Sequence, residues 1–147
     1  MGRLAKWLRL LGYDAALVTR LPPRAPTNCR ALTRNTALAH LPGFTLIEHD
    51  KVDDQLRQVV ENLGLAPDPA RFFSRCLECN LAVAAVSRDQ IQGLAPEYIL
   101  HTAERFTRCP ACGRVYWPGS HGRGALAKLG TWLNLPGRQG SPGDPPF

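Results

Sequence analysis

The chain has 147 residues, of which 44% are hydrophobic, and a formal net charge of +6. This length allows one ordinary domain, or one small domain joined to a metal-binding module. The composition is typical of a globular protein, and no apolar run of about 18 residues is present, so we expect neither a membrane span nor a membrane partner.

The basic excess is concentrated near the start of the chain. Residues 1–40 carry seven basic side chains against one acidic side chain, whereas residues 41–147 carry eleven of each. A one-sided positive field favours a polyanion partner such as RNA or DNA. The alternative is a solvated basic helix face, and composition alone leaves both interpretations open.

The first elements follow from hydrophobic spacing. Residues 2–11 are predicted to form an amphipathic helix, because Leu4, Leu8 and Leu11 fall on one face. Gly12 is suited to end that helix. An apolar run at 14–19 predicts a buried strand, and the prolines within 21–28 predict a loop.

Short strands and helices then alternate. Strands are predicted at 30–33 and 44–48, with a short helix between them that Asn35 caps. Asp50 is predicted to cap a longer helix that runs to about residue 63. This alternation indicates that residues 1–68 form a small three-layer α/β unit with a parallel sheet.

Two Cys-x-x-Cys pairs dominate the second half, Cys76 with Cys79 and Cys109 with Cys112. Two such pairs around a strand-rich insert predict a structural zinc site with four thiolate ligands at about 2.3 Å. The alternative is two disulfides or a redox pair, but no signal peptide supports an oxidising compartment. The fifth cysteine, Cys29, is predicted to be a buried small hydrophobic residue.

The cysteine pairs fix the expected boundaries of the second half. Residues 69–121 are predicted to form a zinc ribbon, with strands near 81–86 and 115–117 and a turn around Pro96. Residues 122–147 are predicted to be a mostly disordered tail, because the segment from 134 onward is rich in Pro and Gly.

Four segments together resemble one known family: residues 2–14 (GRLAKWLRLLGYD), 32–34 (LTR), 75–80 (RCLECN) and 109–121 (CPACGRVYWPGSH). In this order they resemble the Mut-seven C-terminal RNase domain, and the match covers about residues 2–121. The resemblance implies a PIN-like nuclease fold followed by a zinc ribbon. It also implies RNA cleavage with Mg²⁺ or Mn²⁺ held by carboxylates.

The sequence departs from that family in its acidic residues. Family members open with a strand that ends in an aspartate, and this chain starts at Met1 without either; the family's Thr-Arg-Asp reads Thr33-Arg34-Asn35. We therefore expect an N-terminally truncated member with a degenerate acidic site, and no catalytic residue is assigned. We also expect a partner chain or a dimer to complete the sheet.

The candidate nucleic-acid-binding residues come from both halves of the chain. Arg34 and three residues of the first helix (Arg3, Lys6 and Arg9) are predicted to neutralise phosphates. Arg114 and His121 flank the pair Tyr116 and Trp117, which either stacks on bases or packs the ribbon's small core.

Three functions follow from these observations. The first is a cytoplasmic RNA-binding protein of a metal-dependent ribonuclease family. The second is a module on the same fold that binds RNA without cutting it, and the third is a protein-interaction adaptor.

Overall fold

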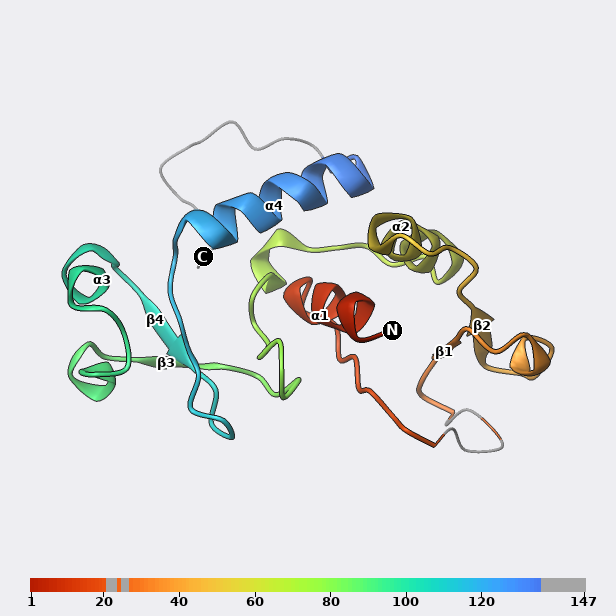
Figure 1. Cartoon of the computed structure of the whole chain (residues 1–147), viewed down its shortest axis with the longest axis horizontal. Helices are drawn as coiled ribbons and strands as arrows, with labels where there is room; N and C mark the ends of the chain where they lie inside the picture. Colours follow the sequence, from red (N-terminus) through yellow and green to blue (C-terminus); the bar gives the residue numbers. More distant parts are fainter. Residues whose placement is uncertain (21–23, 25–26, 136–147) are drawn as a thin grey trace.

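The computed structural model describes residues 1–20, 24 and 27–135 (Figure 1). Its helices and strands, in chain order, are α1 (Gly2–Leu10), β1 (Ala31–Thr33), η1 (Thr36–Leu38), β2 (Phe44–Leu46), α2 (Val52–Asn62), η2 (Pro69–Arg71), β3 (Ala84–Val86), η3 (Asp89–Ile91), α3 (Glu97–Thr102), β4 (Phe106–Arg108), β5 (Val115–Tyr116) and α4 (Ser120–Leu133).

The described strands form two separate sheets. β1 and β2 are parallel, with Ala31 opposite Phe44, whereas β3, β4 and β5 form an antiparallel sheet in that order. The antiparallel sheet and α3 lie at one end of the molecule, β1 and β2 lie at the other, and α1, α2 and α4 lie between them (Figure 1). The predicted fold class is confirmed: a mixed α/β unit with a parallel sheet is followed by a ribbon-like antiparallel sheet.

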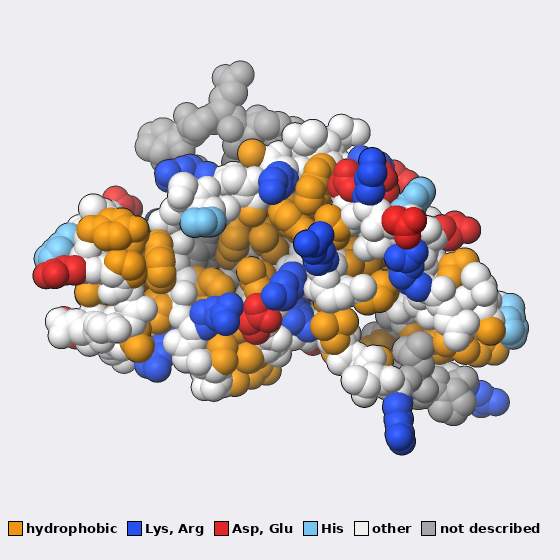
Figure 2. Space-filling view, viewed as in Figure 1, with side chains coloured by type: hydrophobic (Ala, Val, Ile, Leu, Met, Phe, Trp, Pro, Cys, Tyr) orange, Lys and Arg blue, Asp and Glu red, His pale blue; other side chains and the backbone are white. Residues whose placement is uncertain are grey.

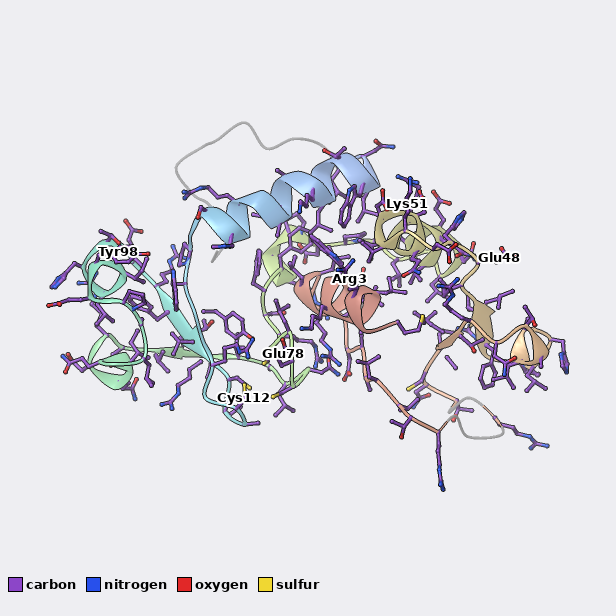
Figure 3. All side chains as sticks on the ribbon, in the orientation of Figure 1. Arg3, Glu48, Lys51, Glu78, Tyr98 and Cys112 are labelled. Atoms are coloured by element: carbon purple, nitrogen blue, oxygen red, sulfur yellow. The ribbon has the colours of Figure 1, made fainter. Side chains whose placement is uncertain are left out.

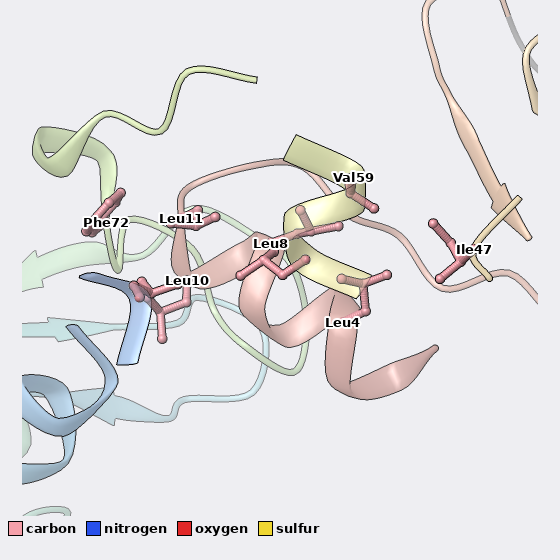
Figure 4. Close-up of a cluster of buried hydrophobic side chains, with 9 residues drawn as sticks. Leu4, Leu8, Leu10, Leu11, Ile47, Val59 and Phe72 are labelled. Atoms are coloured by element: carbon pink, nitrogen blue, oxygen red, sulfur yellow. The ribbon is translucent and has the colours of Figure 1, made fainter. Parts of the chain in front are cut away.

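Three helices build the main hydrophobic core. Leu4 and Leu8 of α1 and Leu11, which directly follows that helix, are buried in one cluster with Val59 of α2 (Figure 4). Leu129 of α4 is fully buried in the same cluster. Since a fully buried leucine contributes about 1.5–3 kcal/mol, this shared core determines how the helices pack.

The C-terminal end of α1 also fixes the start of the second half. Gly12 has a φ of 87°, and a Cβ there would lie 2.5 Å from the carbonyl oxygen of Arg71. The Phe73 amide donates to the Leu10 carbonyl oxygen at 2.8 Å. Only glycine allows so close an approach between the helix end and the η2 turn.

Three predictions in the first half are wrong. Residues 14–19 are not a strand, and Leu17 and Val18 are 55% and 59% exposed, because no described strand lies beside them to pair with their backbone. Asp50 does not cap α2; Lys51 occupies that position, and the Asp50 carboxylate instead pairs with Arg34. Cys29 is exposed rather than buried.

The predicted tail begins with a helix. α4 covers part of 122–147 because Leu126, Leu129 and Leu133 recur at helical spacing and pack on the main core. Asn134 ends the helix in the left-handed region, with a φ of 49°. Residues 136–147 of that tail, and residues 21–23 and 25–26 of the predicted proline loop, lie outside the described residues.

The insert between the cysteine pairs carries a second, smaller core. Ile91, Ala103 and Phe106 are buried there, and Trp117 packs against them. No helix in the described residues is long and apolar enough to cross a bilayer.

Candidate metal centre and nucleic-acid surface

The two cysteine pairs fold into matching turns. In the first, the Asn80 amide donates to the Cys76 carbonyl oxygen at 2.9 Å; in the second, the Gly113 amide donates to the Cys109 carbonyl oxygen at 3.0 Å. Asn80 and Gly113 both have positive φ values, of 66° and 71°. Asparagine and glycine tolerate this conformation best, which explains why they follow the two pairs.

These turns bring the four cysteine sulfurs together. The Sγ atoms of Cys76, Cys79, Cys109 and Cys112 all lie within 4.8 Å of one another. The Cys76 and Cys112 sulfurs are 3.7 Å apart, close to the edge of about 3.8 Å expected for a tetrahedron of sulfurs around zinc, whereas a disulfide bond is about 2.05 Å long. The cluster can therefore hold a zinc ion, and all five cysteines are free thiols.

The environment of the cluster favours one thiolate. Burial raises the pKa of the Cys76 thiol, but hydrogen bonds from Tyr116 and from backbone amides outweigh it and lower the pKa to about 6. Contact with Cys112, together with burial, raises the pKa of Cys79 to about 12. Deprotonation of the Cys76 thiol is therefore favoured, whereas deprotonation of the neighbouring Cys79 thiol is disfavoured. A bound divalent cation would favour the thiolate form of both.

Tyr116 contacts the cluster directly, a role that the sequence analysis missed. Its hydroxyl oxygen lies 3.1 Å from the Cys76 sulfur and accepts a hydrogen bond of 3.2 Å from the Leu77 amide. Burial and this sulfur contact raise the pKa of Tyr116, so the hydroxyl remains a proton donor. The side chain therefore supports the first turn. Its place in β5, directly after the second cysteine turn, was the sequence signal for this role.

Arg9 is not on the surface. Its side chain is only 5% exposed, and its guanidinium donates to the carbonyl oxygens of Ala15, Leu77 and Glu78 at 2.9, 2.7 and 2.9 Å. Two of these acceptors lie inside the first cysteine turn. Arg9 thus ties α1 to the first cysteine turn. Its buried guanidinium is not available to bind a phosphate.

Lys6 and Arg114, two of the predicted RNA-binding residues, meet at one carboxylate. The Glu78 carboxylate lies 2.6 Å from the Lys6 ammonium and 3.4 Å from the Arg114 guanidinium. The hydrogen bond from Lys6, with further attraction from Arg114 and Arg9, lowers the pKa of Glu78. Two exposed cations share one anion, so this part of the surface stays positive.

The remaining predicted residues are spread over the molecule. Arg3 is exposed on α1, with no ion pair among the described residues, and lies in the same region of the view as Glu78 and Cys112 (Figure 3). His121 is exposed in the first turn of α4. Arg34 directly follows β1, away from the cysteine turns, and pairs with Asp50.

The acidic residues near the parallel sheet do not fit a Mg²⁺ or Mn²⁺ site. Asp50 is paired with Arg34, Glu48 contacts the Gln58 amide at 3.5 Å, and the Asn35 side chain accepts from the Ala37 amide. Hard cations require several oxygen ligands directed at one point. Among residues 1–20, 24 and 27–135, the four cysteines are the only group of three or more ligand side chains close enough to share an ion.

Comparison with known proteins identifies the family. Residues 1–129 match the Mut7-C RNAse domain. No curated protein and no solved structure gave a significant match. The matched span includes α1, both cysteine turns and most of α4, and the chain therefore belongs to the Mut7-C RNAse domain family.

Proposed function

We propose that this protein binds RNA through the surface where α1 meets the first cysteine turn. The observation that carries the proposal is the shared Glu78 carboxylate, which brings Lys6 of α1 and Arg114 of the second cysteine turn together. These side chains are 49% and 56% exposed, so each can reach a phosphate. Membership of a ribonuclease family supports RNA as the polyanion.

The charge around this surface supports the same partner. Figure 2 shows Lys, Arg and His side chains around an apolar hollow in the middle of the face in view, with an acidic side chain among the basic ones below it. Arg3 adds a further exposed cation from α1. Because phosphate contacts provide most of the affinity of sequence-independent RNA binding, such a surface suits an RNA backbone. We place the protein in the cytoplasm, where thiolate ligands stay reduced.

Charge removal tests the proposal. The double substitution Lys6→Gln with Arg114→Gln should weaken binding of a labelled single-stranded oligoribonucleotide and lower the salt dependence of log affinity by about 0.7 for each lost phosphate contact. Fluorescence anisotropy of the zinc-loaded chain at several salt concentrations measures both. Arg105→Gln is the control, since Arg105 is an exposed cation just before β4, outside this surface. Equal losses of RNA affinity in the double variant and the control would contradict binding at the proposed surface.

Incubating the chain and the same RNA with and without added Mg²⁺ or Mn²⁺ distinguishes RNA binding from RNA cleavage. Retention of intact RNA supports binding without cleavage. Shortening of the RNA that depends on the added cation supports a ribonuclease of the family's type. A chain that neither retains nor shortens RNA contradicts the proposal and favours the protein-interaction adaptor.

A partner chain is part of this proposal as well. The parallel sheet has two described strands, and the segment at 14–18, which pairs with neither of them, exposes Leu17 and Val18. A short sheet and an exposed apolar segment without a strand partner both suit an added strand from another chain. Light scattering coupled to size exclusion should therefore report a dimer or larger assembly, and a monomer at all concentrations would contradict this expectation.

A further inference from the structure

A groove lies between α1 and the first half of α4. It is largely open to solvent, has a volume of about 370 Å³ and is lined by Trp7, Ser120, His121, Gly124, Ala125 and Lys128. This volume is at the lower end of the range of about 300–1,000 Å³ that small-ligand sites occupy. The apolar hollow visible in Figure 2 lies below α4, with Lys, Arg and His side chains around it.

The core beneath the groove holds its aromatic wall in place. The Trp7 ring meets the Trp132 ring edge to face, with centroids 4.6 Å apart and planes at 64°. Leu129, one residue after Lys128, is fully buried below it. Trp7 is partly exposed, so part of this fixed indole remains open to the groove.

One of the residues that line the groove on α4 is a glycine, Gly124. A Cβ at Gly124 would meet nothing within 4 Å, and its φ lies outside the left-handed region. Neither packing nor backbone geometry therefore requires glycine here, although glycine inside a helix costs about 1 kcal/mol relative to alanine. A larger side chain at position 124 would therefore have open space to enter at the groove.

The lining has the chemistry of a nucleotide site. None of its six residues is acidic, and the Lys128 ammonium has no ion-pair or hydrogen-bond partner among the described residues. An aromatic ring stacks on any nucleobase, and a nearby cation binds the adjoining phosphate. His121 and the Ser120 hydroxyl, which also line the groove, can donate to the same phosphate or to the base edge.

We propose that this groove holds one unpaired nucleobase of a bound RNA strand, with its phosphate on Lys128 and His121. The proposal rests on the RNA binding proposed above and adds a preference for single strands. Lys6 and Trp7 are consecutive on α1 and project about 100° apart around its axis, so the groove and the surface formed by Lys6 and Arg114 lie on neighbouring faces of the same helix. Bases inside a duplex are stacked on each other and cannot enter, whereas unpaired bases can.

Filling the groove tests this directly. Gly124→Leu places a side chain in the open space, and it should lower the affinity for a single-stranded oligoadenylate roughly tenfold, the loss of one stacked base. The affinity for an RNA duplex and the salt dependence of binding should stay the same. Gly130→Leu is the matched control, because a Cβ at Gly130 also meets nothing within 4 Å and Gly130 does not line the groove.

A second pair of variants tests the phosphate contact without adding bulk. Lys128→Gln should weaken binding of the oligoadenylate, whereas Lys51→Gln, at the N-cap of α2 and outside the groove, should not. Thermal unfolding of all four variants checks that α4 remains folded.

The outcomes separate the two proposals. RNA binding that Gly124→Leu leaves unchanged refutes the groove and leaves the proposed function standing. An equal loss of affinity for single strands and duplexes also refutes base insertion. Absence of any RNA binding by the unaltered chain refutes the proposed function, and this proposal with it.

Discussion

Withdrawing zinc from the loaded chain should unfold the antiparallel sheet. The ribbon's own buried core consists of Ile91, Ala103 and Phe106, which is too little apolar area to hold a fold alone. Structural zinc contributes about 10 kcal/mol or more to folding of such modules. Amide hydrogen exchange should therefore show loss of protection in β3 and β4 after chelation, while α2 stays protected by the core that it shares with α1 and α4.

Two cysteine variants make this test specific. Cys109→Ser replaces a buried ligand and should give the unfolded ribbon even with zinc present, whereas Cys29→Ser replaces the exposed cysteine outside the cluster and should change nothing. A ribbon that remains protected without metal, or in Cys109→Ser, would contradict the structural role of the four cysteines.

Arg9→Ala is expected to destabilise the zinc-loaded chain by about 3 kcal/mol or more. The substitution removes three hydrogen bonds that a charged donor makes. The carbonyl oxygens of Ala15, Leu77 and Glu78 each lose the guanidinium as a donor. The midpoint of urea unfolding measures the loss. Arg9→Lys should recover little, since a lysine ammonium cannot reproduce the guanidinium's spread of donors.

The matched control lies on the same helix. Arg3→Ala removes an exposed arginine with no partner among the described residues and should change stability by no more than about 0.5 kcal/mol. Arg9→Ala should also make zinc easier to remove, because Leu77 and Glu78 lie inside the first cysteine turn. Equal unfolding midpoints for Arg3→Ala and Arg9→Ala would show that Arg9 does not join the helix to the metal centre.

Local patterns in the sequence predicted the parts of the fold that depend on neighbouring residues. Helical spacing located α1 and α2, Asn35 was correctly identified as the cap of η1, and the spacing of the cysteine pairs predicted the cluster. Each of these depends on contacts within a few residues, or on a ligand set with a fixed geometry.

The errors concern residues whose place depends on distant partners. Arg9 reads as one more cation on a basic helix, and only the first cysteine turn, which lies nearly 70 residues later, makes it a buried donor. The apolar run at 14–19 resembles a buried strand, but a strand also needs a neighbour with which to pair. The helix α4 was not predicted, because its glycines at 122, 124 and 130 have low helix propensity. Its stability comes instead from packing of Leu129 and Trp132 on the core.

The candidate surface was predictable in composition but not in arrangement. Lys6, Arg114 and His121 were identified as candidate nucleic-acid-binding residues, yet nothing local indicated that Glu78 would join the first two. The groove beside Trp7 was not foreseen, because it depends on how α4 returns across α1 after the ribbon.

The central claim is that residues of α1 and of the cysteine turns form one RNA-binding surface, which zinc holds together. The most direct test measures the affinity of one preparation for single-stranded RNA in three states: zinc-loaded, zinc-free and reloaded. We predict that affinity falls roughly tenfold or more without zinc, because Arg114 loses its position beside Lys6, and that it returns on reloading. Unchanged affinity in a zinc-free chain whose ribbon amides exchange freely would contradict the account.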